Sequence, residues 1–150
     1  MKTIVVTSWY FNPLHPGHIE CFELCKKLWD ELWVIVNNDN QVKAKTHKDI
    51  VFQDEQFRLK IVSSLKSVDL AILSIDNVDS SISVCESIKY VTDIIRQKYW
   101  LDTKIIFGKW GDRFNSNIPE VQVCIDHNIE IRDGLGDKTH NSSDYRIKLI

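Results

Sequence analysis

Two histidines that flank a glycine are the residues of this sequence best suited to chemistry. His15, Gly17 and His18 lie in segment 10–18, after a short β-branched run and at the expected start of a helix. A helix N-terminus presents free backbone N–H groups and a partial positive charge, so it suits an anion. Glycine lets a phosphate approach the backbone closely, and side chains three positions apart share a helix face. The pattern predicts a clamp for a phosphoryl group. The structural alternative is that His15 caps the loop and His18 belongs to the core.

Other familiar kinds of site are not indicated. The sequence contains neither a Walker P-loop nor a Gly-x-Gly-x-x-Gly segment. Its four cysteines are Cys21, Cys25, Cys85 and Cys124. They lack the paired spacing of a zinc site, so we expect buried free thiols and no protein metal site.

The phosphoryl clamp needs a scaffold, and strand-like and helix-like segments alternate along the whole chain. The expected strands are residues 2–8, 32–36, 68–73, 103–107 and 129–131, and the expected helices are residues 16–28, 54–65, 80–99 and 118–127. Apolar strands joined by helical crossovers favour a parallel sheet covered on both faces. We therefore expect one α/β domain over residues 1–150, with a Rossmann-like, doubly wound, five-stranded parallel sheet.

Ligands of such a sheet bind beyond the carboxyl ends of its strands. The histidine segment follows the first expected strand. The polar segment 38–49, which we expect to be a loop, follows the second and carries Lys43 and Lys45. These lysines are either part of the site or part of a solvated loop.

Composition limits the class of protein. Hydrophobic residues make up 43% and charged residues 27% of the 150 residues, and the formal net charge is −2. These values are typical of a globular domain, and the charge argues against a nucleic-acid-binding protein. No apolar run reaches the roughly 18 residues of a membrane span, and the first residues do not resemble a secretory signal. We expect a soluble, cytoplasmic protein that binds neither nucleic acid nor membrane.

The histidine segment resembles the His-x-Gly-His signature of the nucleotidyltransferase superfamily. Residues 15–18 are His-Pro-Gly-His, and Phe11-Asn12-Pro13-Leu14 precede them. The resemblance is closest to the cytidylyltransferase-like branch, which includes glycerol-3-phosphate cytidylyltransferases and heptose-1-phosphate adenylyltransferases. Matching segments follow in order at residues 30–39, 55–58, 67–69, 111–113 and 141–143. The similarity thus extends over essentially the whole chain.

This resemblance implies a reaction. The phosphate of a small acceptor attacks the α-phosphorus of a nucleoside triphosphate and releases pyrophosphate, without a covalent enzyme intermediate. The donor is ATP or CTP, with ATP favoured by Gly111-Asp112, and Mg²⁺ is bound through the triphosphate oxygens. The expected acceptor is a phosphorylated sugar, polyol or alcohol, and the expected assembly is a homodimer. Catalysis then depends on positioning and charge stabilisation.

The resemblance also implies three groups of site residues. The catalytic group is His15, His18, Lys43 and Lys45. The nucleotide-binding group is Tyr10, Phe11, Asn12, Gly17, Gly111, Asp112, Arg113, Asn141, Ser142 and Ser143. The acceptor-binding group is Asn38, Arg58 and Trp110, although Arg58 could instead pair with Glu55 on one helix face.

Two other functions are compatible with the sequence. One is coenzyme synthesis by an adenylyltransferase of the pantetheine-phosphate or flavin (FMN) type. The other is a nucleotide-binding module without activity, since Trp9 and Asn12 stand where the family usually has Gly and Asp. Pyrophosphate release across nucleotides and acceptors would distinguish them.

Overall fold

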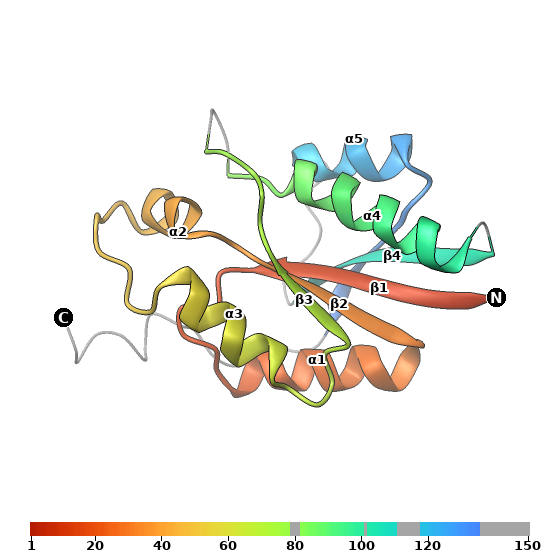
Figure 1. Cartoon of the computed structure of the whole chain (residues 1–150), viewed down its shortest axis with the longest axis horizontal. Coiled ribbons are helices and arrows are strands. Elements are labelled where there is room, and N and C mark those ends of the chain that lie inside the picture. The colour runs from red at the N-terminus through yellow and green to blue at the C-terminus, as the bar shows by residue number, and fades with distance from the viewer. Residues whose placement is uncertain (79–81, 101, 111–117, 136–150) are drawn as a thin grey trace.

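A computed structural model describes residues 1–78, 82–100, 102–110 and 118–135, and at residues 110 and 133–135 it describes the backbone alone (Figure 1). The strands are β1 (Lys2–Trp9), β2 (Glu31–Val36), β3 (Leu70–Leu73), β4 (Thr103–Trp110) and β5 (Glu130–Leu135). The helices are α1 (Pro16–Leu28), α2 (Asp39–Thr46), α3 (Glu55–Ser63), α4 (Cys85–Tyr99) and α5 (Pro119–Asp126). None of these helices has the length and apolar character needed to cross a bilayer.

The described strands form one parallel sheet in the order β3-β2-β1-β4-β5. The expected fold class is confirmed: a five-stranded, doubly wound, Rossmann-like sheet with helices on both faces (Figure 1). From β1 the chain proceeds to β2 and β3 on one side and then crosses to β4 and β5 on the other. The order therefore reverses between β1 and β4, and ligands of such sheets bind at this point, beyond the carboxyl ends of the strands.

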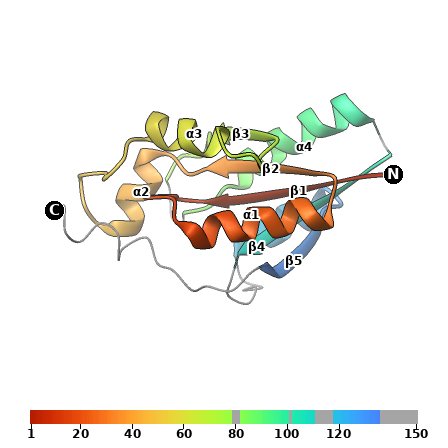
Figure 2. The same cartoon turned by 90° about the horizontal axis from the view of Figure 1, so that it is seen from below.

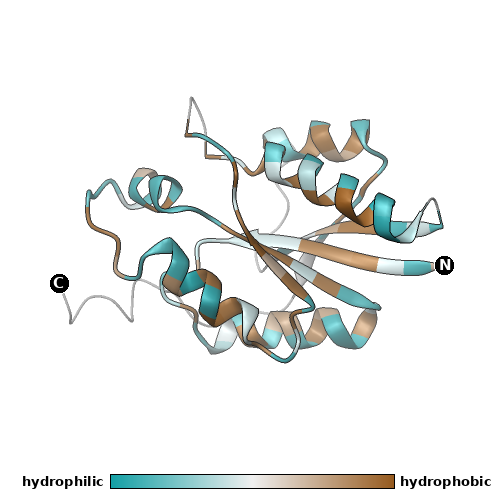
Figure 3. Ribbon diagram, in the orientation of Figure 1, coloured by the Kyte–Doolittle hydropathy of each residue, from teal (hydrophilic) through white to brown (hydrophobic). Residues whose placement is uncertain are grey.

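The core consists of two layers, because successive strand residues face opposite sides of the sheet. On one face, Ile4 and Val6 of β1 pack with buried residues of α4 and α5. On the other face, Val5 packs with buried residues of α1 and α3. Figure 3 shows hydrophobic stretches along the strands between the two helix layers. Both layers hold the carboxyl end of β1 in place.

Helix α2 is the main departure from the expected elements, since segment 38–49 is not a loop. Asn38 and Gln41 form a capping box: Asn38 Oδ1 accepts from the Gln41 N–H (3.0 Å), and Gln41 Oε1 accepts from the Asn38 N–H (2.9 Å). The helix buries only Gln41 and Val42. Because the helix buries so few apolar residues, this segment shows no helical spacing of apolar residues in the sequence.

Three boundaries also differ by three residues or more, one of them being the end of β5, which lies at Leu135 instead of residue 131. Strand β4 continues past Gly108 to Trp110, with an irregular register between these residues. Helix α4 begins at Cys85, later than the expected residue 80 or 81. The thiols of Cys21, Cys25 and Cys124 are buried and free, as expected, whereas that of Cys85 is half-buried.

Candidate active site

The two histidines of the motif form a stacked pair at the start of α1. His15 is the N-cap residue, and its Nδ1 accepts from the Gly17 N–H at 3.1 Å. His18 Nδ1 in turn accepts from the His15 N–H at 3.1 Å. Both side chains are buried, and their ring centroids are 3.7 Å apart with planes inclined by 22°. Pro16 suits the first helical position, where no N–H is needed. Sequence and local geometry thus place both rings at one helix end.

These hydrogen bonds determine the tautomer of each neutral ring. An imidazole nitrogen that accepts a backbone N–H is deprotonated, so the proton of His15 and of His18 resides on Nε2. Each ring therefore has an Nε2–H donor at the positive end of a helix dipole. Such donors suit an anion that gains charge during a reaction. His15 caps the helix through Nδ1, as the simpler alternative predicted, and this role is compatible with donation from its Nε2 to an anion.

The loop between β1 and α1 is anchored by its own side chains. Phe11 has a positive φ of 53°, which is unfavourable for a residue with a Cβ. Its ring is buried, edge-on against His18 (4.9 Å) and Phe22 (5.6 Å). Asn12 is also buried, and its Oδ1 accepts from the Gln53 N–H at 3.2 Å. Because both side chains contact the protein, a nucleotide would meet the backbone of these residues, as the family resemblance implies.

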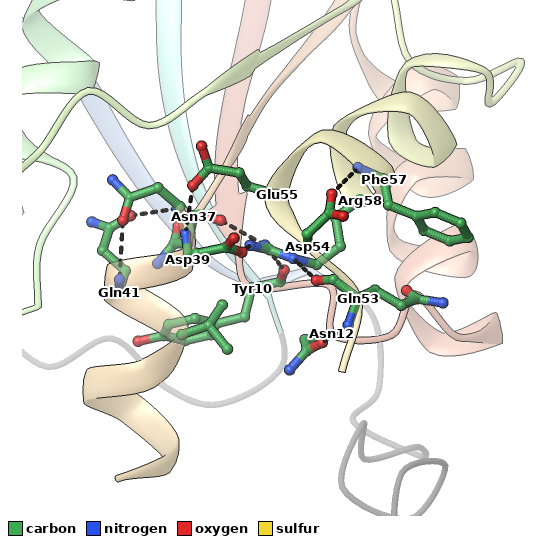
Figure 4. Close-up of polar contacts among 12 residues, drawn as sticks. Tyr10, Asn12, Asn37, Asp39, Gln41, Gln53, Asp54, Glu55, Phe57 and Arg58 are labelled. Atoms are coloured by element: carbon green, nitrogen blue, oxygen red, sulfur yellow. Dashed lines mark hydrogen bonds and ion pairs between the residues drawn. The ribbon is translucent and has the colours of Figure 1, made fainter. Parts of the chain in front are cut away.

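Arg58 does not occupy the place expected of an acceptor-binding residue. Its side chain is 1% exposed and makes four hydrogen bonds within the protein (Figure 4). Nε donates to Gln53 O (2.8 Å), Nη1 to Tyr10 O (2.7 Å) and Asn37 O (2.6 Å), and Nη2 to Asp39 Oδ1 (2.8 Å). Burial lowers the pKa of Arg58, and Asp39 opposes that shift. The guanidinium thus joins the chain beyond β1, the chain beyond β2 and the start of α2.

Of the two sequence-based interpretations of Arg58, the pairing with Glu55 is wrong, and contact with the acceptor stays a prediction. A guanidinium has five N–H groups, and protein oxygens take four of those of Arg58. Its carboxylate partner is Asp39 rather than Glu55. Glu55 Oε1 instead accepts from the Asp39 N–H at 2.9 Å, which reinforces the same junction (Figure 4).

Asn38 is likewise used by the protein itself. Its Oδ1 caps α2, and its Nδ2 donates to Ser74 O (3.2 Å) and Asp76 O (2.9 Å). The side chain thereby ties the end of β2 to the segment after β3. The prediction that Asn38 binds the acceptor is not supported, because its amide group already has partners at both atoms.

The two candidate lysines lie on α2, which starts at the same end of the sheet as α1 (Figure 2). Lys43 is half-buried and Lys45 is exposed. Within the described part of the chain, neither forms an ion pair. Residues two apart on a helix point in different directions. The contact of either lysine with a phosphate stays a prediction.

Several predicted site residues fall outside the described part of the chain. These are Gly111, Asp112, Arg113, Asn141, Ser142 and Ser143, together with the side chain of Trp110. Among the described residues, no cluster of three or more His, Cys, Asp or Glu could hold a metal ion.

A small hollow at the reversal point contains residues that the sequence patterns did not single out. It has a volume of about 60 Å³ and lies among Trp9, Tyr10, Asn37, Ser83, Lys109 and Glu120. Burial, and then the charge of Glu120, raises the pKa of Tyr10 to about 12. Tyr10 was expected at the site, Trp9 stands in the family's loop, and Asn37 falls within the matching segment 30–39. The other three, Ser83, Lys109 and Glu120, belong to no segment that the sequence patterns singled out.

A family model described as cytidylyltransferase-like matches residues 10–107. The chain belongs to the cytidylyltransferase-like family. It is therefore a nucleotidyltransferase, as the His-Pro-Gly-His segment predicted, and the alternative of a module without activity is not supported.

Three proteins illustrate what this chain is similar to within and around the family. An FAD synthase of Methanocorpusculum labreanum is 38% identical over 126 residues, which are 84% of this chain and 80% of that protein. The bifunctional protein HldE of Pasteurella multocida is 41% identical over 68 residues, which are 45% of this chain and 14% of that protein. A crystal structure of a lipopolysaccharide core biosynthesis protein from Thermoplasma volcanium has a TM-score of 0.60 and 26% identity, covering 89% of this chain and 96% of that one.

Proposed function

We propose that this protein transfers AMP from ATP to FMN, which yields FAD and pyrophosphate. The observation that supports this proposal is the similarity to an FAD synthase over 84% of this chain and 80% of that protein. The similarity to HldE spans only 14% of the latter. The comparisons thus favour the coenzyme alternative over the phosphorylated sugar, polyol or alcohol that we expected first. ATP rather than CTP follows, because FAD contains an adenylate.

The proposed step is a single displacement at phosphorus. An oxygen of the FMN phosphate forms a bond to the α-phosphorus of ATP, and the bond from that phosphorus to the bridging oxygen of the β-phosphate breaks. The electron pair leaves with pyrophosphate. No general base is needed, because the attacking phosphate is already ionised at neutral pH. The protein then has to position two phosphates and stabilise the growing negative charge.

In this reaction His15 and His18 donate from Nε2 to the phosphates at the start of α1. Support for this role comes from their shared tautomer and their stacked geometry. Lys43 or Lys45 of α2 contributes a positive charge, and Gly17 permits close approach to the backbone. Mg²⁺ would enter with the triphosphate rather than through a protein cage, and would supply further charge neutralisation. The homodimer and the cytoplasmic location remain predictions.

The test is pyrophosphate release with purified protein. ATP with FMN should release pyrophosphate and form FAD, detected by chromatography, whereas CTP with FMN should be much slower. Phosphorylated sugars form a second acceptor panel, since they belong to the acceptor class that we expected first. FAD formation supports the proposal. Release with a sugar phosphate but not with FMN would overturn it in favour of the acceptor class we expected first.

A further inference from the structure

We infer that Glu120 binds vicinal hydroxyls of a substrate in the small hollow between the ends of β1 and β4. Such hydroxyls occur both in the ribose of ATP and in the ribityl chain of FMN. The inference rests on the proposed function and adds a specificity-determining residue to it. The hollow lies where the strand order reverses, which is the place where sheets of this kind bind their ligands.

The two carboxylate oxygens of Glu120 differ in their contacts. Glu120 lies in the first turn of α5 and is 8% exposed. Its Oε1 accepts from the Val84 N–H at 3.2 Å, which fixes the carboxylate at the start of α4. Within the described part of the chain nothing donates to Oε2, and no ion pair includes Glu120. Oε2 is also not one of the buried side-chain atoms that lack a partner, so it keeps accessible surface.

The carboxylate of Glu120 borders the hollow. Glu120 is one of the lining residues, together with Trp9, Tyr10 and Lys109. The carboxylate is close enough to the Tyr10 hydroxyl for its charge to raise the pKa of Tyr10, after the larger effect of burial. Polar atoms of nearly buried side chains usually have partners. An accessible oxygen without one, beside a hollow at the reversal point, is therefore suited to a donor on a ligand.

Lys109 of β4 adds a donor to the same hollow. Its side chain is half-buried, and its Nζ lies 5.9 Å from the centroid of the Trp9 ring. Among the described residues, no carboxylate forms an ion pair with it. A hydroxyl both donates and accepts hydrogen bonds, so it can donate to Glu120 Oε2 and accept from Lys109 Nζ. A group that only donates or only accepts would satisfy one of the two.

The size of the hollow also favours hydroxyls. A volume of about 60 Å³ has room for a few water-sized groups, which suits hydroxyls better than a whole base or flavin ring. A carboxylate that accepts from a ribose hydroxyl is a recurring arrangement in doubly wound sheets. Because the ribose and the ribityl chain present the same chemistry, the experiment has to distinguish these two sources.

The first arm measures the Kd of ATP and of FMN by calorimetry for wild type, Glu120→Gln and Glu86→Gln. Glutamine keeps an oxygen for the Val84 N–H but replaces the second oxygen with an amide NH₂ group, which cannot accept. We expect the Kd of the substrate that enters the hollow to rise at least about 10-fold, the loss of a hydrogen bond to a charged group. Glu86 also lies in the first turn of a helix but is exposed, so its variant should bind both substrates as wild type does. Thermal unfolding checks that both variants are folded.

The second arm identifies the source of the hydroxyls. 2′-Deoxy-ATP and 3′-deoxy-ATP each lack a ribose hydroxyl, and a flavin with an unsubstituted phosphoalkyl chain lacks those of the ribityl chain. Wild type should bind the deoxy compounds of one series about 10-fold more weakly than the parent substrate. Glu120→Gln should bind parent and deoxy compound alike. A loss in the ATP series assigns the hollow to the ribose, and a loss in the flavin series assigns it to the ribityl chain.

Two results would overturn the inference and leave the proposed function intact. In the first, wild type binds parent and deoxy compounds alike in both series. In the second, a folded Glu120→Gln discriminates between them as wild type does. Because binding is measured without turnover, a wild type that binds its substrates but forms no FAD contradicts the proposed function alone. A wild type that binds neither ATP nor FMN contradicts both.

Discussion

At the scale of single residues, two atoms of one imidazole have different tasks in this site. The Nδ1 atom of His18 accepts from the His15 N–H and so completes the capping box of α1. Its Nε2 atom is protonated as a consequence and is the one assigned to the phosphates. Substitution of His18 by alanine therefore removes both the acceptor for the His15 N–H and the Nε2–H donor. A second variant is needed to tell the effects of these two losses apart.

We predict that His18→Ala lowers kcat by about 10²–10³, the usual loss for one donor to a charge that develops in the transition state. His18→Asn is the matched control, because its amide oxygen can replace Nδ1 as the acceptor for the His15 N–H. We expect the asparagine variant to recover the unfolding temperature but not kcat. Kinetics and thermal unfolding of both variants check this. A folded His18→Ala enzyme with wild-type kcat contradicts the assigned role.

At the scale of elements, two polar side chains, the buried Arg58 and the half-buried Asn38, connect the segments that carry the site. Arg58 of α3 reaches the chain beyond β1, the chain beyond β2 and the start of α2. Asn38 connects α2 to the segment after β3. Both act through the elements they hold, so their loss should affect the geometry of the site rather than its chemistry.

We predict that Arg58→Lys lowers both the unfolding temperature and kcat. Lysine keeps the charge but lacks the planar fork that contacts three carbonyl oxygens and Asp39. A larger truncation would leave three carbonyl oxygens and the half-buried Asp39 carboxylate without this donor, so the lysine variant, which keeps the charge, is the informative one. Lys60→Ala, at an exposed position of the same helix, should match wild type. Unchanged kinetics in Arg58→Lys would show that the junction does not position the site.

A second prediction at this scale separates the two functions of the Asn38 amide. Asn38→Ser keeps an oxygen that can cap α2 but loses the Nδ2–H donors to Ser74 O and Asp76 O, whereas Asn38→Ala loses both. We expect the serine variant to be more stable than the alanine variant by about 1 kcal/mol, the usual value of an N-cap. Urea denaturation measures the difference. Equal stabilities would mean that the capping box contributes nothing.

At the scale of the whole molecule, one carboxylate links β1, β2 and α4 at the opposite end of the sheet. Glu31 Oε2 accepts from Lys2 Nζ (2.8 Å) and from the Tyr99 hydroxyl (2.5 Å), and its Oε1 accepts from the Trp33 indole N–H (3.0 Å). Burial opposes the ionisation of Glu31, but these hydrogen bonds outweigh it and lower its pKa from 4.5 to about 2.

The lowered pKa of Glu31 predicts an acid-sensitive contribution to stability. A carboxyl whose pKa is lower in the folded state stabilises that state above its unfolded value, here 4.5, and the contribution is lost as the pH falls toward 2. Its size is at most about 3 kcal/mol. Glu31→Gln should flatten the dependence of the unfolding free energy on pH across this interval. If the unfolding free energy of Glu31→Gln depends on pH as that of wild type does, other groups are responsible for the dependence.

The sequence was informative where structure depends on neighbours along the chain. The apolar strands, the start of α1 at Pro16 and the start of α3 next to Asp54 are all local patterns, and the structure has them close to where the sequence predicts. Helix α2 was missed because it has almost no apolar face, and its capping box alone begins the helix. The site was anticipated where it depends on the histidine motif, which is local too.

The sequence by itself predicted the class of chemistry, because its His-Pro-Gly-His segment resembles the signature of the nucleotidyltransferases, and the family model confirms that class. Only the tertiary structure decided the tasks of the other polar residues. Arg58 donates to Tyr10 and Asn37, which lie 48 and 21 positions away along the chain. No spacing rule connects such residues. They meet because a parallel sheet brings the carboxyl ends of its strands to one edge, where buried polar groups must find partners.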